Sequence, residues 1–540
     1  MDNINQEKAS TVKKVDLTLK KGVFFIPWSL LILMVVLSFV NKDGFLGGLN
    51  AVTGWILGNF AWLFNSVTIL CVATVIIVYF SPLGKVRIGG KKAKPIVSYG
   101  NLVWITLCID LGAGILFWAA AEPMYHMFAP AAMTGAAPGS PEAATFAMET
   151  MFLEWTWSPM AIYTVAGILF AFVFHNMKEQ ASLGSGLVPV FGPKVRKYKS
   201  VVDVVCLFAV AAGMAASLGT GAMTIAGGLE NIAGIQSGPV SWAIVIAVIV
   251  VTFIISSVSG VDKGIKILSN INSKAYFILL AFVIIFGPTA FMANFTFESI
   301  GAYLSDFFKM SFATGDIYND GWAKGWPIFY WCNWLAWTPV TGVFIGHILK
   351  GYTIKQGITC NFVIPALFST LWMGLFATAS IYYENAGMGF HDMLLDKGPE
   401  SIIYAIFDQF PLAIVVIPFY LFLIFISFVT AADSNTTAMA GLCTSGNASG
   451  DVAAPTYLKV VWGVTIGAVT WVLISLADIE GVKAASNLGG FPNMFLVGLF
   501  AVGLLKICRN PKKYDVHKED YEEGSHGQYK VDYDDDADVS

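Results

Sequence analysis

Apolar runs separated by short polar connections fill the chain from about residue 23 to residue 507. Each run is about 20 residues long, which is the length that an α-helix needs to cross the hydrocarbon core of a bilayer. A backbone in lipid must satisfy its own hydrogen bonds, so we interpret the runs as helices. The twelve predicted spans are residues 23–40, 57–80, 99–121, 150–174, 201–226, 239–258, 274–295, 326–349, 358–381, 413–440, 457–476 and 489–507. The pattern predicts an all-α polytopic membrane protein.

The polar connections differ in charge, and this difference predicts an orientation. Lysine and arginine are concentrated in the N-terminal segment 1–22 and after the second, fourth, sixth and eighth spans, whereas the other connections carry isolated lysines. Because basic connections stay in the cytoplasm, both termini are expected on the cytoplasmic side of the inner membrane.

Two polar segments lie outside the predicted spans. Residues 297–323 are amphipathic and are expected to form a helix along the outer membrane surface. The tail 508–540 begins basic and ends acidic, a composition typical of disorder, with a regulatory role as the alternative.

Composition agrees with a membrane protein and argues against other classes. The 540 residues are 56% hydrophobic and 13% charged, whereas about 25% of residues in soluble domains are charged. The net charge of −4 and the lack of a concentrated basic patch give no support for a nucleic-acid partner. The seven cysteines form no CxxC or Cys/His cluster, and no HExxH, Ser/His/Asp or paired-Asp constellation lies within the spans. We therefore expect no enzyme activity, no structural metal and no cofactor, and the polar start of the chain is unlike a cleavable signal peptide.

The third span contains the sequence Asp110-Leu111-Gly112-Ala113-Gly114. Glycines in a membrane helix permit either close packing or a local unwinding that turns backbone groups toward a substrate or an ion. An ionisable residue inside a span is costly and usually functional, so Asp110 favours the second interpretation.

Aromatic residues gather in the fourth and eighth spans. Trp155 and Tyr163 are about 80° apart around a helix and can line one face. Trp331, Trp334 and Trp337 follow at spacings of three and share one side of the eighth span. An interfacial belt of tryptophans is the alternative, but this cluster continues into the span. Indole faces stabilise a cation without hydrogen-bond donors by about 2 kcal/mol or more once it is desolvated, so the pattern favours a cage for a quaternary-ammonium group.

The segment Gly325 to Trp334 resembles the signature of the betaine/choline/carnitine transporter family, and Glu122-Pro123 and Ala432-Asp433-Ser434 match it too. The resemblance covers about residues 20–507 in collinear order. It implies a LeuT-like fold of two inverted five-helix repeats, about 99–295 and 326–507, after two extra N-terminal helices, and a homotrimer that works by alternating access. It also implies a substrate site formed by Trp155, Tyr163, Trp331, Trp334, Trp337 and the backbone around Gly112 and Gly114.

The sequence departs from the family at several site positions. Asn333 and Met160 stand where many betaine carriers have tryptophan, and Asn333 either hydrogen-bonds the substrate or contacts a neighbouring helix. Choline carriers tend to have Asp at the position of Gly114, so Gly114 favours a zwitterion such as glycine betaine or carnitine, whereas Asp110 favours a cation.

Residues expected at the coupling-ion site also differ. Sodium-coupled members use two adjacent hydroxyl residues of the tenth span with carbonyls of the third, here Leu111, but Thr430-Ala431 supplies one hydroxyl. Lys274 lies in a region where sodium-independent relatives place a fixed positive charge. It either replaces the ion, paired with Asp110, or snorkels to the cytoplasmic surface. Na⁺ stays a candidate coupling ion beside sodium-independent exchange and proton coupling.

Together these features predict a secondary transporter, embedded in the bilayer, for a quaternary-ammonium or related sulfonium zwitterion. Sodium- or proton-coupled uptake of an osmoprotectant or choline is the alternative, and a membrane sensor of onium compounds is the alternative of a different class.

Overall fold

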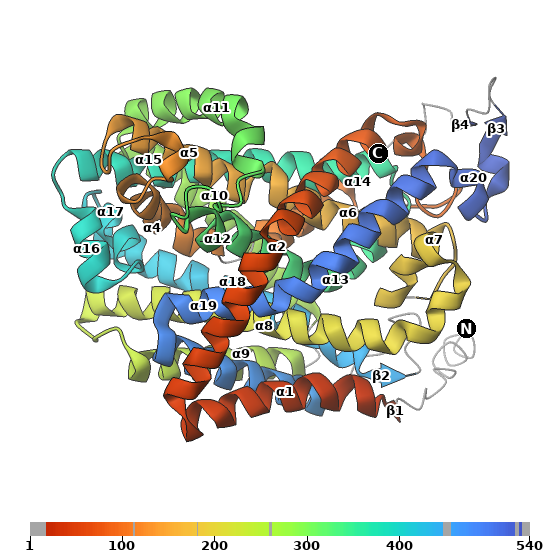
Figure 1. The fold of residues 1–540 in the computed structure, drawn as a ribbon, viewed down its shortest axis with the longest axis horizontal. Helices are drawn as coiled ribbons and strands as arrows, with labels where there is room; N and C mark the ends of the chain where they lie inside the picture. The colour runs from red at the N-terminus through yellow and green to blue at the C-terminus, as the bar shows by residue number, and fades with distance from the viewer. Residues whose placement is uncertain are drawn as a thin grey trace, which may run out of the picture.

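The structure is a computed structural model that describes residues 18–111, 114–180, 182–258, 262–445, 455–523 and 529–531. Within these residues eight helices are long and apolar enough to cross a membrane, and the number rises to ten if each of two bent helix pairs is one span. The all-α polytopic membrane architecture is therefore confirmed. The long helices α1 (Lys21–Val40), α8 (Lys199–Ala233) and α9 (Pro239–Val258) run side by side along the long axis of the molecule (Figure 1).

The first two helices are α1 (Lys21–Val40) and α2 (Lys42–Phe80). The predicted polar connection 41–56 is thus mostly helical, because it contains no proline that would end the helix. The 39 residues of α2 extend about 58 Å, roughly twice the thickness of a hydrocarbon core. Such a helix must cross a bilayer obliquely, and α2 runs diagonally over the molecule (Figure 1).

The predicted third span is a broken helix. It consists of α3 (Tyr99–Leu111) and α4 (Gly114–Phe128), whose axes differ by 51°. The fourth span is broken as well, into α5 (Pro141–Trp155) and α6 (Trp157–His175). Pro159 cannot donate a backbone hydrogen bond to the carbonyl of Trp155, which accounts for a weak point here. Both breaks lie inside the apolar part of the chain.

The predicted seventh span and surface helix have different boundaries in the structure. Helix α10 (Asp262–Phe286) ends at Gly287-Pro288, and α11 (Thr289–Ser311) then turns by 109°. The expected boundaries of 295 for the span and 297–323 for the surface helix are therefore wrong. Proline disfavours a helical conformation in the residue before it, so the helix ends at this point.

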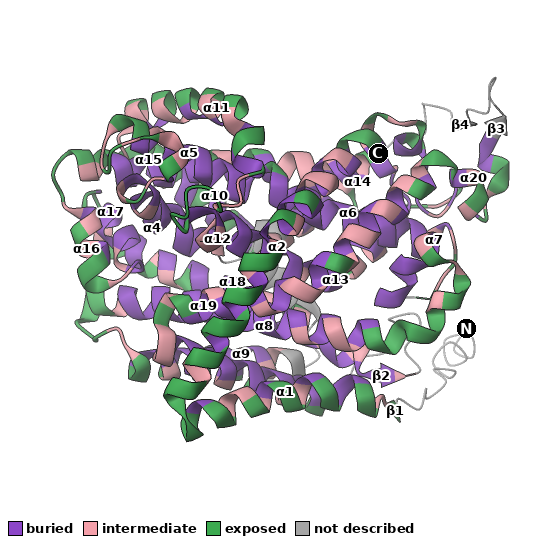
Figure 2. Ribbon diagram, viewed as in Figure 1, coloured by how far each residue is buried: buried purple, intermediate pink, exposed green. Residues whose placement is uncertain are grey.

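Helices α13 (Pro327–Ile348) and α19 (Thr456–Arg509) form the centre of the fold together with α6 and α8 (Lys199–Ala233). The tryptophans, asparagine and prolines of α13 lower its hydropathy, so it is not among the eight apolar helices. The 54 residues of α19 hold two predicted spans and are interrupted at Asp478, which has φ 51°. Figure 2 shows that buried residues are concentrated on these central helices, whereas α1, α2 and α11 carry many exposed residues.

The remaining elements are short or lie between the central helices. They are α7 (Val188–Phe191), α9 (Pro239–Val258), α12 (Trp322–Gly325), α14 (Ile354–Ile358), α15 (Ile364–Asn385), α16 (Phe390–Lys397), α17 (Ser401–Asp408), α18 (Ala413–Leu442) and α20 (Pro511–Tyr514). Strand β1 (Thr18–Leu19) pairs antiparallel with β2 (Thr444–Ser445), and β3 (Tyr521–Glu523) pairs antiparallel with β4 (Tyr529–Val531).

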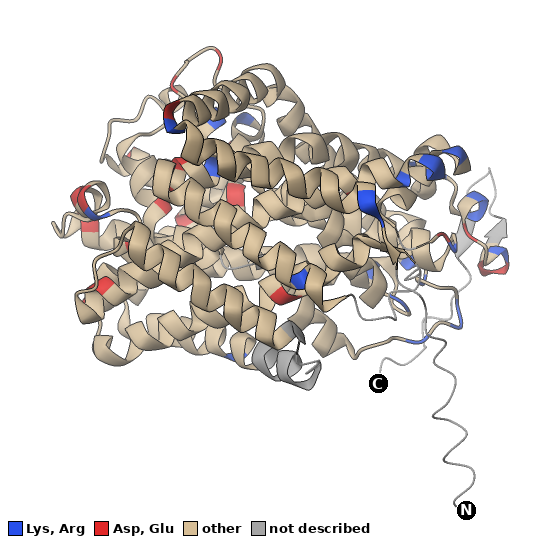
Figure 3. Ribbon diagram, turned by 90° about the horizontal axis from the view of Figure 1, so that it is seen from below, with Lys and Arg blue, Asp and Glu red and all other residues tan. Residues whose placement is uncertain are grey.

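The basic connections and the elements β1 (Thr18–Leu19) and α20 (Pro511–Tyr514) lie at one end of the molecule. Lys and Arg gather toward the right of Figure 3, the end that carries α7, α20 and β1 in Figure 1. Residues 511–523 are bound to the rest of the molecule, because Asn176 Nδ2 donates to Asp515 Oδ2 at 2.7 Å and the Lys91 amide donates to Asp520 Oδ2 at 2.8 Å. The expectation of a disordered tail is therefore wrong for residues 511–523, where polar side chains bind it to the helix bundle.

Candidate functional site

Three of the predicted cage residues meet in the core, where the break between α5 and α6 faces α13. The ring centres of Trp155 and Trp334 are 5.5 Å apart at 85°, and those of Tyr163 and Trp334 are 5.4 Å apart at 80°. Tyr330 extends the group, with its ring centre 5.2 Å from that of Trp155. All four side chains are buried. Such edge-to-face contacts are favourable between aromatic rings, so the four form one cluster.

The other two predicted cage tryptophans point elsewhere. Residues three apart on a helix differ by about 60°, so Trp331 and Trp337 lie about 120° from one another. The indole nitrogen of Trp331 donates to Asn65 Oδ1 on α2 at 2.9 Å, and a Cβ at Gly213 on α8 would lie 2.9 Å from the Trp337 nitrogen. The structure therefore leaves Trp331 and Trp337 outside the ring contacts of the cluster.

Asn333 makes the contact with a neighbouring helix that was one of its two predicted roles. Ser486 Oγ on α19 donates to Asn333 Oδ1 at 3.2 Å. The two helices approach closely nearby, since a Cβ at Gly490 would lie 2.2 Å from the carbonyl oxygen of Cys332. A role of Asn333 in substrate binding stays a prediction.

The glycine-rich stretch reaches the cluster at Gly114, the first residue of α4. A Cβ at position 114 would lie 3.2 Å from Trp155 Cη2. Gly112 lies outside the described residues, as do the side chains of Asp110 and Leu111.

The predicted coupling residues lie on two other helices. Thr430 is half-buried on α18, and its hydroxyl donates to the carbonyls of Ile426 at 2.9 Å and Ser427 at 3.1 Å. Lys274 is exposed on α10, whereas the adjacent Ser273 contacts Cys108 Sγ on α3 at 2.9 Å. Both coupling roles, and the pairing of Lys274 with Asp110, stay predictions.

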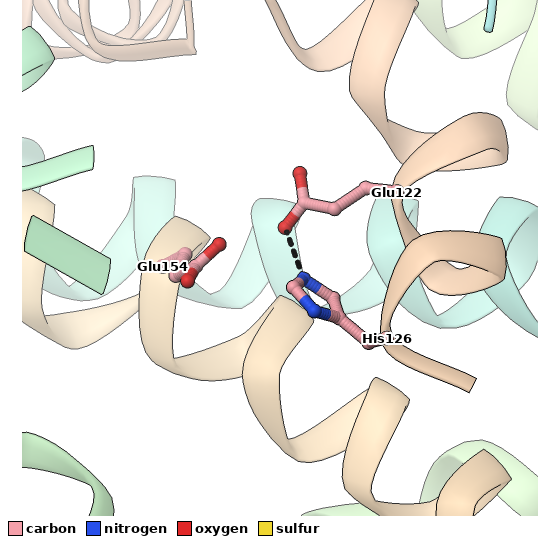
Figure 4. A group of neighbouring side chains, drawn as sticks. All are labelled: Glu122, His126 and Glu154. Atoms are coloured by element: carbon pink, nitrogen blue, oxygen red, sulfur yellow. Dashed lines mark hydrogen bonds and ion pairs between the residues drawn. The ribbon is translucent and has the colours of Figure 1, made fainter. Parts of the chain in front are cut away.

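A cluster of ionisable side chains that the sequence reasoning missed lies directly beside the aromatic rings. Glu122 and His126 on α4 and Glu154 on α5 are fully buried and point toward one another (Figure 4). One carboxylate oxygen or imidazole nitrogen of each lies within 4.8 Å of the others. Glu154 lies inside the predicted span 150–174, where an ionisable residue is costly and usually functional, so it offered the same signal as Asp110; Glu122 and His126 follow the predicted end of the third span at residue 121.

The two glutamates differ in their hydrogen bonds. Glu122 Oε2 accepts from Trp155 Nε1 at 3.2 Å and also from the hydroxyl of Tyr330, and Glu122 Oε1 lies 3.4 Å from His126 Nε2. Neither carboxylate oxygen of Glu154 has a hydrogen-bond partner among the described residues. The backbone carbonyl of Glu154 accepts from Trp334 Nε1 at 3.1 Å. The indole N–H groups of Trp155 and Trp334 therefore both donate to residues of the ionisable cluster.

Trp326 covers the cluster and separates it from a lysine on α19. The ring centres of Trp326 and His126 are 4.6 Å apart, and Lys483 Nζ lies 4.1 Å from the Trp326 ring centre. Lys483 Nζ also forms an ion pair with Glu480 at 3.2 Å. The charge of Lys483 is therefore partnered outside the buried cluster.

Comparison with known proteins gives the family. The model of the betaine/carnitine/choline family of transporters matches residues 22–513. A probable glycine betaine transporter of Desulfitobacterium hafniense is 29% identical over 494 residues, 90% of this chain and 97% of the relative. An ectoine/hydroxyectoine transporter of Virgibacillus pantothenticus is 27% identical, over 93% of this chain and 99% of the relative. An osmo-independent choline transporter of Acinetobacter baylyi is 29% identical, over 85% and 87%.

The family match runs from α1 into α20 and so includes both the aromatic cluster and the broken third and fourth spans. A multi-pass helical fold with a buried aromatic site is what a carrier of small solutes requires. The chain therefore belongs to the betaine/carnitine/choline family of transporters.

Proposed function

We propose that the chain is a secondary transporter that carries a quaternary-ammonium zwitterion, with glycine betaine as the first candidate, across the cell membrane by alternating access. The observation that carries this proposal is the buried cluster of Trp155, Tyr163 and Trp334 at the break in the fourth span. The glycine betaine and choline transporters among the relatives support the substrate class.

The hydrogen bonds of the two indoles explain why an onium group suits this cluster. The N–H groups of Trp155 and Trp334 are bound to Glu122 and to the Glu154 carbonyl, so the ring faces are what remain for a substrate. Ring faces attract a cation without requiring it to donate a hydrogen bond. A trimethylammonium group has no donors, so it loses none on entering this site, whereas a primary amine would lose several.

Twelve spans and cytoplasmic termini are part of the proposal. The eight apolar helices and the two bent pairs give ten spans, and α13 is an eleventh. Helix α19 is interrupted at Asp478, and counting its two parts as separate spans gives twelve. An even number of spans leaves both ends on one side. The gathering of Lys and Arg at the end of the molecule that carries β1 and α20 supports the cytoplasm as that side (Figure 3). The inverted repeats and the homotrimer stay predictions of the resemblance.

Choline is a second candidate substrate, and the ionisable cluster favours it. Glu122 and Glu154 place carboxyl groups beside the cage, and a carboxylate there attracts a net cation more strongly than a zwitterion. Gly114 at the position where choline carriers tend to have Asp argues for the zwitterion.

Counterflow in proteoliposomes tests the proposal. We expect vesicles with purified protein and internal glycine betaine to accumulate labelled glycine betaine, and Trp334→Ala to abolish it. Labelled choline and ectoine in parallel define the preference, and each substrate with and without a sodium gradient defines coupling. Binding of an onium compound without any counterflow would contradict a carrier and favour a sensor.

A further inference from the structure

The cluster of Glu122, His126 and Glu154 contains more hydrogen-bond acceptors than there are donors beside it in the described part of the chain. All three side chains are fully buried, and both oxygens of Glu154 and Nδ1 of His126 lack partners among the described residues. A buried carboxylate without a donor is unstable, but a protonated carboxyl brings its own O–H donor. A carboxyl oxygen of Glu122 lies within 4.8 Å of one of Glu154, so two ionised carboxylates there would repel each other strongly. Burial and mutual repulsion therefore both favour a proton on one of the two carboxyl groups.

The two carboxyl groups differ in the hydrogen-bond donors that they receive. Glu122 accepts from the indole of Trp155 and the hydroxyl of Tyr330, and both donors stabilise a carboxylate. Glu154 receives no such donor among the described residues. The donors therefore favour the negative charge on Glu122 and the proton on Glu154.

Lys483 is the nearest other charged group on the packed helices, and its positive charge acts on His126 and Glu154 across Trp326. Lys483 on α19 is paired with Glu480 beyond Trp326. Glu400, ahead of α17, accepts from Ser237, and His391 on α16 stacks on Phe128 with ring centres 3.9 Å apart. In the described part of the chain, Tyr330 and His126 are thus the titratable groups beside the carboxyl pair, and Lys483 is a nearby positive charge paired with Glu480.

The pair is connected to the cage by two hydrogen bonds. Trp155 Nε1 binds the Glu122 carboxylate, and Trp334 Nε1 binds the Glu154 carbonyl. A cation held against these two rings therefore shares one buried region with both carboxyl groups. Its positive charge stabilises a second negative charge there, because charges interact strongly where water is absent.

We propose that Glu122, His126 and Glu154 hold one exchangeable proton, and that binding of an onium group in the aromatic cluster releases it. The O–H bond of Glu154 breaks, the electron pair stays on the carboxylate, and the proton passes to water on the side to which the site is open. The proton is therefore a competitor of the onium group and not a co-transported ion. This inference rests on the proposed function, because the onium group is the ligand that displaces the proton.

Proton release on binding is the direct test. Purified wild-type protein in weakly buffered detergent solution receives glycine betaine, or choline as a second onium probe, while a pH dye records protons and calorimetry records binding. We expect up to one proton released per onium bound, and a dissociation constant that rises up to tenfold for each unit of decrease in pH. The infrared band of a protonated carboxyl should weaken on binding.

Two variants separate this proposal from a structural role of the cluster. Glu154→Gln keeps the shape but cannot release a proton, so we expect weak, pH-independent binding without release. Glu149→Gln, a change of another buried glutamate on α5, should behave like the wild type. If Glu154→Gln does not fold, the proton-release and infrared measurements on the wild-type protein still test whether onium binding releases a proton.

The possible failures are distinguishable. Onium binding without proton release, or with proton uptake, would overturn this proposal and leave the proposed function intact. Unchanged release in Glu154→Gln would overturn the assignment of the proton to Glu154. If neither glycine betaine nor choline binds, the proposed function fails and this inference fails with it.

Discussion

Gly114 lies directly against the indole of Trp155, so that a Cβ at position 114 would come within 3.2 Å of Trp155 Cη2. Trp155 also contacts the rings of Tyr330 and Trp334 and is buried. We expect Gly114→Ala to displace the indole and weaken binding of glycine betaine about tenfold, a size typical of overpacking. Calorimetry measures it. Gly100→Ala on α3, where a Cβ meets no atom within 4 Å, is the control. Equal affinity of both variants would contradict the argument.

Trp334 and Trp331 are a matched pair on one helix with different surroundings. Trp334 contacts Trp155 and Tyr163, whereas Trp331 binds Asn65 on α2. We expect Trp334→Leu to raise the dissociation constant for glycine betaine about 30-fold, which corresponds to a cation–π energy of about 2 kcal/mol. Trp331→Leu should lower the unfolding temperature and change affinity less than about threefold. Equal losses of affinity would show that both rings bind substrate.

Local patterns in the sequence were sufficient for the membrane architecture and for the helices that supply the site. Each of these patterns is a property of a single segment: the apolar runs, the glycine-rich stretch at the start of α4 and the aromatic residues of α13. The direction of Trp331 depends on its neighbour, because Asn65 on α2 offers an acceptor 266 positions away in the chain. No periodicity within residues 326–349 contains that information.

The ionisable cluster was missed for a similar reason. Glu122 and Glu154 lie on different helices, and their proximity depends on how α4 packs against α5. The break at Gly287-Pro288, in contrast, was readable in the sequence, since proline ends the preceding helix. Hydropathy alone concealed it because apolar residues continue past the break.

Glu400, outside the spanning helices, should make stability depend on pH. Burial raises the pKa of its carboxyl to about 7, and Asp478 and Glu230 add to this, while hydrogen bonds from the backbone and Ser237 oppose it. The folded state then binds the proton more tightly than the unfolded state, whose pKa is 4.5. The stability that this carboxyl contributes therefore falls by at most about 3 kcal/mol as pH rises from about 4.5 to about 7. Above about pH 7 its contribution no longer changes with pH.

Thermal unfolding of Glu400→Gln in detergent measures this effect. We expect the variant to show a smaller decrease in unfolding temperature between about pH 5 and pH 7.5 than the wild type. Glu298→Gln, at an exposed position on α11, should keep the wild-type profile. A profile that is unchanged by Glu400→Gln would assign the pH dependence to another group.

Asn176 connects three segments at the basic end of the molecule. Its Oδ1 accepts from the Gly89 amide at 2.9 Å, and its Nδ2 donates to Asp515 Oδ2 at 2.7 Å and to the Arg87 carbonyl at 3.3 Å. The side chain is buried, so Asn176→Ala leaves these groups without partners and should cost about 2–4 kcal/mol. We expect a lower unfolding temperature and faster proteolysis of the segment after residue 510. Asn231→Ala removes an exposed bond to Asp408 at 2.9 Å and should change neither. Unaltered proteolysis in Asn176→Ala would mean that the remaining contacts, such as the Lys91 amide to Asp520, hold the segment alone.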